Sequence, residues 1–214
     1  MKAGVALTLG LLILAAAWLG PLPELAGTAF IAHMGMHVSV IAVAAPLIAL
    51  GLGGSRLDPV RRLPWLFSPV PASIVEFVVV WGWHAPVLHH AARHQPGAMM
   101  LEQGMFLAVG LLLWLSAFGG ESGQRAGRTA AGIGGLLLTS MHMTLLGALL
   151  ALGPRPLFGH AEVAGFGLTA LEDQHLGGVL MLLVGGSAYL LGGLYLLSGL
   201  LREPKGPSPQ AGRP

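Results

Sequence analysis

Two histidines and two methionines lie within an apolar segment near the start of the chain. The segment, residues 30–51, reads FIAHMGMHVSVIAVAAPLIALG and places these side chains at His33, Met34, Met36 and His37. Because His33 and His37 are four residues apart, they share one face of a helix, which is the spacing by which a helix gives two ligands to one metal ion. Imidazole and thioether donors without thiolate suit Cu(I). The segment therefore predicts a copper site inside an apolar helix.

The composition of the chain places this helix in a membrane. Of the 214 residues, 54% are hydrophobic and 9% are charged, whereas soluble domains have about 25% charged residues. The chain has no cysteine, which excludes thiolate metal sites, iron–sulfur clusters and disulfides. The net charge is only +2 and the basic residues are spread across loops, so no basic face forms and nucleic-acid binding is excluded.

The hydrophobic pattern predicts an all-α polytopic membrane protein with six transmembrane helices. About 20 apolar residues are needed to cross the hydrocarbon layer of a bilayer. We expect a single transmembrane helical domain over 1–201 and a disordered cytoplasmic tail over 202–214, which is rich in Pro and Gly. The first apolar stretch also has features of a signal peptide, but its length favours a retained helix. The six stretches lie at about 3–19, 28–51, 70–91, 98–118, 130–152 and 175–200.

Positive charges give the expected orientation. Of the 11 lysines and arginines, nine fall on the side of the N-terminus and two, Arg93 and Arg155, fall on the other side. Because cytoplasmic loops carry the excess of Lys and Arg, we expect both termini to be cytoplasmic. All nine histidines then lie in outer loops or in the outer and middle parts of helices. A neutral scatter would place about half of them towards the cytoplasm, so the asymmetry indicates a site on the external side.

Four of these histidines are predicted to bind one metal ion. At about 1.5 Å per residue they lie roughly 8 to 15 Å below the outer boundary, so imidazoles from three helices can meet. Desolvation at this depth favours neutral imidazole, the form that binds metals. The alternative is that each histidine joins two helices by one hydrogen bond. The predicted ligands are His33, His37, His84 and His142, and the additional ligands or ligand partners are Met34, Met143, Met181, His89, His175, Glu102 and Asp173.

Other polar and small residues have structural interpretations. Asp173 precedes the last apolar stretch and is suited to cap its N-terminus. Glu76 lies two turns before His84, where a hydrogen-bonded structural carboxylic acid is favoured over a proton relay. Glycines recur every seven residues from Gly178 to Gly199, a pattern typical of close helix packing.

Four segments share an order and placement along the chain: HMGMHVSVIAVAAPLIALG, WGWHAPVLHHAA, MHMTLLGALLAL and EDQHLGGVLM. Together, from about residue 28 to 200, they resemble the polytopic CtaG-type family of cytochrome c oxidase assembly proteins. The resemblance implies a non-enzymatic factor of a bacterial plasma membrane that helps to place copper in a haem–copper oxidase. Family members often have one more helix than the six counted here. The motif positions that the resemblance implies are His33, His37, Pro46, Trp83, His84, Pro86, His142, Asp173, Gln174, Gly177 and Gly178.

The leading hypothesis is therefore a copper-binding assembly factor with its site towards the external side. Its partners would be an oxidase subunit, an external copper donor and the lipid bilayer. The alternative is a haem b electron carrier, in which His33 or His37 pairs with His84 as axial ligands. A di-iron oxygenase is disfavoured because too few histidine boxes exist, and a transporter because no matching pair of broken helices is found.

Overall fold

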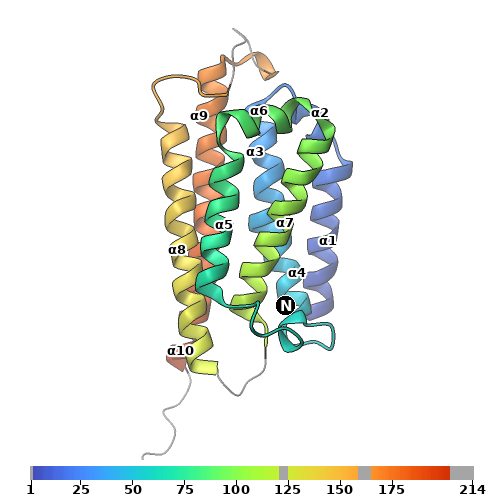
Figure 1. Cartoon of the computed structure of the whole chain (residues 1–214), viewed down its shortest axis with the longest axis vertical. Helices are drawn as coiled ribbons and strands as arrows, with labels where there is room; N and C mark the ends of the chain where they lie inside the picture. The colour runs from blue at the N-terminus through green and yellow to red at the C-terminus, as the bar shows by residue number, and fades with distance from the viewer. Residues whose placement is uncertain (1, 121–124, 159–164, 203–214) are drawn as a thin grey trace, which may run out of the picture.

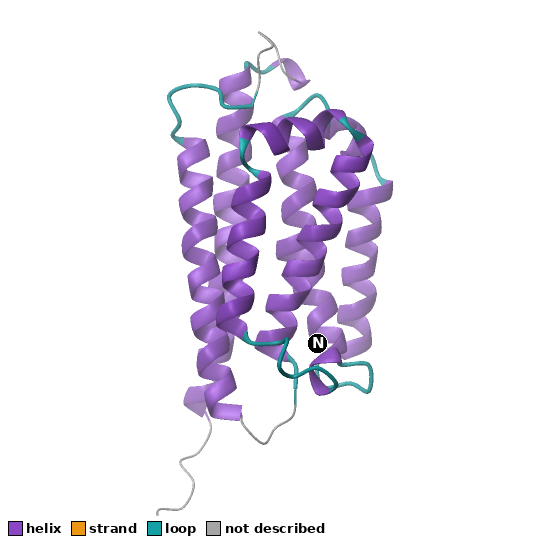
Figure 2. Ribbon diagram, in the orientation of Figure 1, coloured by secondary structure: helices purple, strands orange, loops and turns teal. Residues whose placement is uncertain are grey.

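The computed structural model describes residues 2–120, 125–158 and 165–202, and in these residues it contains helices and no strands (Figure 1, Figure 2). The predicted all-α fold is confirmed. Residues 203–214 of the predicted tail and His160 lie outside the described residues. The α-helices are α1 (Ala3–Leu19), α2 (Leu22–Ala26), α3 (Phe30–Val38), α4 (Ala45–Leu52), α5 (Pro69–Trp83), α6 (Pro86–His94), α7 (Pro96–Phe118), α8 (Arg125–Ala151), α9 (Ala170–Leu180) and α10 (Ser187–Arg202).

Four helical segments of the described chain are long and apolar enough to cross a membrane. Two of them contain a π-helical section, η1 (Ser39–Ala44) between α3 and α4 and η5 (Met181–Gly186) between α9 and α10. The bent pair of α5 and α6 brings the number to five if the pair forms one span. Six spans were predicted, and the described chain contains four or five candidates for them. The orientation of the termini stays a prediction. The four segments are Phe30–Leu52, Pro96–Phe118, Gly127–Ala151 and Ala170–Arg202.

The first predicted span, α1, is an apolar helix of 17 residues that is shorter than these segments. It packs along α4, and a methyl group on Gly51 would lie 2.6 Å from Cβ of Leu7. A similar approach joins α8 to η5, where a methyl group on Gly147 would lie 2.8 Å from the backbone nitrogen of Leu182. Glycine at both positions therefore lets the backbones come close, as in other membrane helix pairs.

The predicted single helix over 70–91 was wrong, because the chain breaks it at His84. α5 ends at Trp83, α6 begins at Pro86, and the two helices are bent by 72°. Proline has no N–H for the helical ladder and keeps the preceding Ala85 in an extended conformation, with ψ of 134°. The break turns α6 across the end of the bundle (Figure 1). As a result, His84 and the histidines of α6 approach the bundle from two directions.

A buried polar network ties the middle of the bundle together. The carbonyl oxygen of Ile41, in η1, accepts hydrogen bonds from Trp114 Nε1 (3.2 Å) and from the Tyr189 hydroxyl (3.3 Å). Tyr189 also donates to the carboxyl of Glu76, which accepts a second bond from Thr139 Oγ1 at 3.2 Å. Glu76 is thus held by two hydroxyl groups, as expected for a structural carboxylic acid. Helices α5, α7, α8 and α10 meet η1 at this network.

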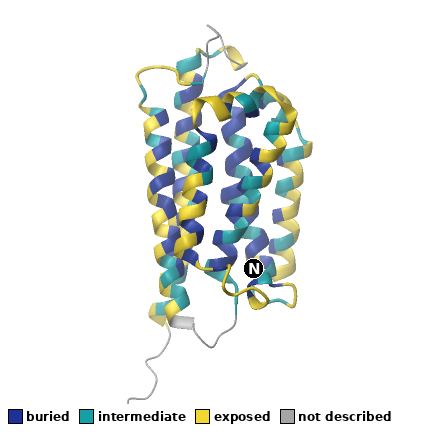
Figure 3. Ribbon diagram, in the orientation of Figure 1, coloured by how far each residue is buried: buried dark blue, intermediate teal, exposed yellow. Residues whose placement is uncertain are grey.

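The buried side chains concentrate on the helix faces that point into the bundle (Figure 3). Large apolar side chains such as Val78, Met141 and Leu191 are exposed on its outside. A soluble domain rarely exposes so extensive an apolar surface, whereas lipid covers it in a membrane. The core of the bundle lies around α3, η1 and α7, and this is where the polar candidate residues are found.

Candidate metal centre

The first part of the candidate site is formed by α3 and α7. His33 and His37 lie one turn apart on the buried face of α3, and Glu102 of α7 faces them. Glu102 Oε1 is 3.3 Å from Nε2 of His33 and 3.3 Å from Nε2 of His37. One potential ligand atom from each residue lies within 4.8 Å of the other two. Two imidazoles and one carboxylate therefore converge, as the spacing of His33 and His37 predicted.

Two more imidazoles join them from α6 and from the end of α5. The ring centroid of His33 lies 4.2 Å from that of His37 and 4.7 Å from that of His89. His84 is the fourth histidine, and its ring centroid lies 5.8 Å from that of His37 and 6.4 Å from that of His89. We call these four residues the histidine cluster; their exposed fractions are 0%, 4%, 7% and 1% in chain order. The break at Pro86 makes the cluster possible, because it returns His89 towards His33.

Several ligand atoms of the histidine cluster have no hydrogen-bond partner among the described residues. They are His33 Nδ1, His37 Nε2, His84 Nε2 and both ring nitrogens of His89, and Oε2 of the neighbouring Glu102 likewise has no partner. The Nδ1 atom of His84 donates to the carbonyl oxygen of Val80 at 2.7 Å, which leaves a lone pair on Nε2. A backbone carbonyl that orients a histidine in this way is typical of metal ligands. Leaving such buried atoms unpaired costs about 1–3 kcal/mol each, and a bound cation offsets that cost.

The tautomer of His37 is fixed by residues that the sequence analysis did not single out. Trp18 Nε1 can only donate, and it donates to Gln103 Oε1 at 3.3 Å. This orients the amide of Gln103 so that its nitrogen donates to His37 Nδ1 at 2.8 Å. His37 therefore carries its proton on Nε2, which faces Glu102. A clue was present in the sequence, because Gln103 follows Glu102 directly within an apolar helix.

A small cavity with sulfur donors adjoins the histidine cluster. Its volume is about 10 Å³, close to the space that one water molecule or ion requires. His37 and His84 line it together with Met34, Met143 and Met181, the three methionines expected near the ligands. The remaining lining residues are Val38, Ile41, Val80 and Phe106. The cavity thus combines imidazole with thioether donors, the combination that suits Cu(I).

The structure places His142 apart from the other three predicted ligands. Its ring contacts Phe77 at a centroid distance of 5.3 Å, and it lines a cavity of about 790 Å³ between α5 and α8 with Met141. Met143, one residue further, lines the cavity of the histidine cluster instead. Successive residues of a helix point about 100° apart, so α8 turns His142 and Met143 towards different surroundings.

Two further candidates form hydrogen bonds with the backbone. His175 Nε2 donates to the carbonyl oxygen of Gly153 at 2.8 Å. Asp173 accepts from the backbone nitrogens of Phe30 (2.6 Å) and Ile31 (2.9 Å), so it caps α3. The prediction that Asp173 caps its own helix was wrong, because Thr169 is the N-cap of α9 and forms a capping box with Glu172. Asp173 contributes to the site by holding the turn that precedes His33.

Aromatic rings cover the histidine cluster at the end of the bundle. Phe158 stacks on Phe30 at a centroid distance of 5.0 Å and contacts the ring of His89 at 4.3 Å. Arg93 holds this arrangement by donating to the carbonyl oxygens of Phe158 and Ala26, both at 3.1 Å.

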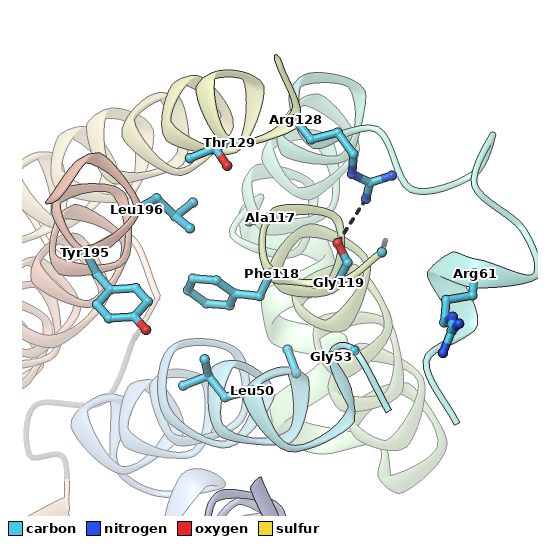
Figure 4. Close-up of a pocket in the computed structure, with 13 residues that line it drawn as sticks. Leu50, Gly53, Arg61, Ala117, Phe118, Gly119, Arg128, Thr129, Tyr195 and Leu196 are labelled. Atoms are coloured by element: carbon cyan, nitrogen blue, oxygen red, sulfur yellow. Dashed lines mark hydrogen bonds between the residues drawn. The ribbon is translucent and has the colours of Figure 1, made fainter. Parts of the chain in front are cut away.

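Another cavity, drawn in close-up in Figure 4, lies at the end of the bundle opposite the histidine cluster. Its volume is about 690 Å³, and Arg61 and Arg128 are among its lining residues. Arg128 donates to the carbonyl oxygen of Gly119 at 3.3 Å. We call it the arginine cavity. No histidine, methionine or acidic residue is among its described lining residues, so it offers no ligand set for a metal ion.

Comparison with known proteins identifies the family. The family model described as cytochrome c oxidase caa3 assembly factor (Caa3_CtaG) matches residues 2–203. The chain belongs to this family. The match covers every helix described above and confirms the resemblance seen in the sequence motifs. Neither the curated proteins nor the solved structures gave a match. The family and the apolar helices indicate a multi-pass membrane protein with an oxidase as its partner, and the family suggests a non-enzymatic role.

Proposed function

We propose that this assembly factor binds a copper ion, as Cu(I), at the histidine cluster and passes it to a subunit of the haem–copper oxidase. The observation that carries the proposal is the free lone pair of His84 Nε2 beside a cavity that Met34, Met143 and Met181 also line. The copper is cargo, so a moderately held ion serves the function better than a permanent one. His142 is not part of the ligand set in this proposal, because it lines a different cavity.

The charge of the cluster supports a monovalent ion. Glu102 is the only acidic residue among the described residues that approach the histidine cluster. A buried ion is costly unless a charge of opposite sign compensates it. One carboxylate neutralises Cu(I), whereas Cu(II) would keep a net positive charge in an apolar surrounding. The three methionines favour the same oxidation state.

The position of the cluster supports delivery on the external side. The cluster lies near the start of α3, at the end of the bundle opposite the marked N-terminus (Figure 1). The excess of Lys and Arg at the N-terminal end supports a cytoplasmic position for that end. In a bacterial plasma membrane the copper would then be received from an external donor and released towards the external part of the oxidase.

Bis-histidine haem binding receives less support from the geometry. A haem requires two axial imidazoles on opposite sides of a porphyrin plane. The rings of His33 and His37 instead contact each other edge to face at 4.2 Å, and His37 and His84 are 5.8 Å apart. The adjoining cavity, at about 10 Å³, has room for an ion and not for a porphyrin. The arrangement thus favours a bound ion.

Metal analysis of the purified protein tests the copper site. We expect copper in the wild type and a loss of at least about tenfold in affinity for His84→Leu, because its Nε2 lone pair is the best oriented ligand atom. His142→Leu is the matched control, and it should retain the copper. A folded His84→Leu protein with unchanged copper content would refute the site. An optical spectrum with a Soret band would support haem b instead.

Deletion of the gene tests the function in the cell. Without the factor, the oxidase should contain its haem but be low in copper and in activity, and added copper should restore part of the activity. Complementation with the His84→Leu variant should fail, whereas His142→Leu should restore the oxidase. Normal copper in the oxidase of the deletion strain would refute the delivery role.

A further inference from the structure

A second pair of histidines lies on the outer surface of α6. His90 and His94 are both exposed, and their ring centroids lie 4.3 Å apart. The two residues are four positions apart, so both rings extend from the same face of the helix. This is the spacing of His33 and His37 in the buried cluster, and it lets two imidazoles bind one metal ion.

The two faces of α6 have different surroundings. His89 is buried and its ring lies 4.7 Å from that of His33, whereas the next residue, His90, is exposed. Because α6 is bent by 72° from α5, it lies across the end of the bundle (Figure 1). One helix therefore presents a histidine to the buried cluster and two histidines to the surface.

The basic residue of α6 is directed away from the exposed pair. Arg93 lies between His90 and His94 in the sequence, but its guanidinium donates to the carbonyl oxygens of Ala26 (3.1 Å), Gly27 (3.3 Å) and Phe158 (3.1 Å). These three acceptors hold the guanidinium on the side of α6 that faces the bundle. The exposed face thus carries two imidazole ligands and can accept a cation.

We propose that His90 and His94 form a second, surface-accessible copper site that captures an ion before it enters the histidine cluster. Binding by the pair stands on its own geometry, whereas its role in loading rests on the function proposed above. Imidazole binds copper in either oxidation state, so no electron transfer is needed. The ion would move inwards by ligand exchange, in which one imidazole replaces another.

The test is a Cu(I) titration of the detergent-purified protein under anaerobic conditions, with a competing chelator that buffers the free ion. The double variant His90→Ala/His94→Ala should bind one ion fewer per chain than the wild type. Each single variant should lower the affinity for this ion by at least about tenfold, because one imidazole then binds it in place of two. His175→Ala is the matched control, since this partly exposed histidine bonds the carbonyl oxygen of Gly153. His90 and His94 are exposed, and exposed positions tolerate such changes, so their variants should fold.

The outcomes separate the surface site from the buried one. Two ions in the wild type and one in the double variant support the proposal. A single ion that the double variant loses also supports the surface site, and it refutes the buried copper site. An unchanged number of ions in the double variant overturns the proposal. For the loading role, the double variant should fill the buried site more slowly at low free copper, and an equal rate overturns that role.

Discussion

The two ends of the bundle differ in whether their buried polar groups have hydrogen-bond partners. The histidine cluster is enclosed, and each of its four members has a ring nitrogen without a hydrogen-bond partner among the described residues. The arginine cavity at the other end has a volume of about 690 Å³, and Gly53, Gly54 and Arg61 of the neighbouring loop line it (Figure 4). The acidic residue of this loop, Asp58, is buried and hydrogen-bonded. Asp58 accepts from the backbone nitrogens of Gly54 (2.8 Å), Val60 (3.0 Å) and Gly120 (2.9 Å). One end keeps unpaired lone pairs in its interior, and the other end pairs its buried acid completely.

This contrast separates a ligand site from a structural junction. Cavity size alone would select the arginine cavity over the cavity of about 10 Å³ beside His84. Unpaired buried nitrogens are a better indicator, because each one destabilises the fold by about 1–3 kcal/mol unless a ligand binds it. The histidine cluster concentrates that cost within one small volume. The difference between the ends therefore predicts that copper binding responds to changes at one end only.

The largest effect is expected for Glu102→Gln. The change removes the one carboxylate beside His33 and His37 while keeping its shape, so the bound cation loses its compensating charge. We expect a loss of about a hundredfold in Cu(I) affinity, which corresponds to about 2.7 kcal/mol. Glu76→Gln is the control, because Glu76 bonds Tyr189 and Thr139 and not the cluster. Equal affinities for the Glu102→Gln and wild-type proteins would show that the ion binds elsewhere.

The next effect concerns the other end of the bundle. Asp58→Ala removes the acceptor of three backbone N–H groups that join residues 53–62 to the end of α7. The free energy of unfolding should fall by about 1–3 kcal/mol, as for other lost buried hydrogen bonds. Copper affinity should stay within about twofold, since additivity holds for distant sites. Thermal unfolding and the Cu(I) titration measure the two quantities, and a tenfold loss of copper affinity would contradict the independence of the two ends.

Reversal of the hydrogen bond between Gln103 and His37 should raise the affinity of the histidine cluster for Cu(I). In Gln103→Glu, the carboxylate can only accept, so His37 must place its proton on Nδ1 and free Nε2 for the ion. This is the usual arrangement of a metal-bound histidine, and Cu(I) affinity should rise by about tenfold. Gln103→Leu is the control, because it removes the bond without reversing it. A loss of affinity in Gln103→Glu would mean that His37 does not bind through Nε2.

Local sequence patterns predicted the parts of this structure that depend on neighbouring residues. The shared face of His33 and His37 follows from their spacing, and the all-α fold follows from the apolar stretches. The break at Pro86 was missed, although proline and the restricted residue before it give the signal. The break decides that His89, expected only as an additional residue, joins the cluster.

The features of the structure that depend on helix rotation and on contacts between distant residues could not be predicted from the sequence. Depth in the membrane suggested that His142 could meet the other histidines, but depth does not give the rotation of α8 about its axis. Asp173 and Phe30 are separated by 143 positions, and nothing in the local sequence pairs them. The orientation of Gln103 depends likewise on Trp18, which lies 85 positions earlier in α1.

The smallest effect tests how firmly α3 must be held for the histidine cluster to form. Asp173→Ala removes the two bonds that cap α3 at Phe30 and Ile31, which should lower stability by about 1 kcal/mol. Because His33 follows within one turn, fraying at this end should also lower the affinity for Cu(I) by about twofold to threefold. Thr169→Ala is the matched control, since it removes the cap of α9 instead. Its stability should fall by a similar amount with copper affinity unchanged. If both variants weaken copper binding equally, the affinity follows global stability, and Asp173 has no particular role in positioning His33.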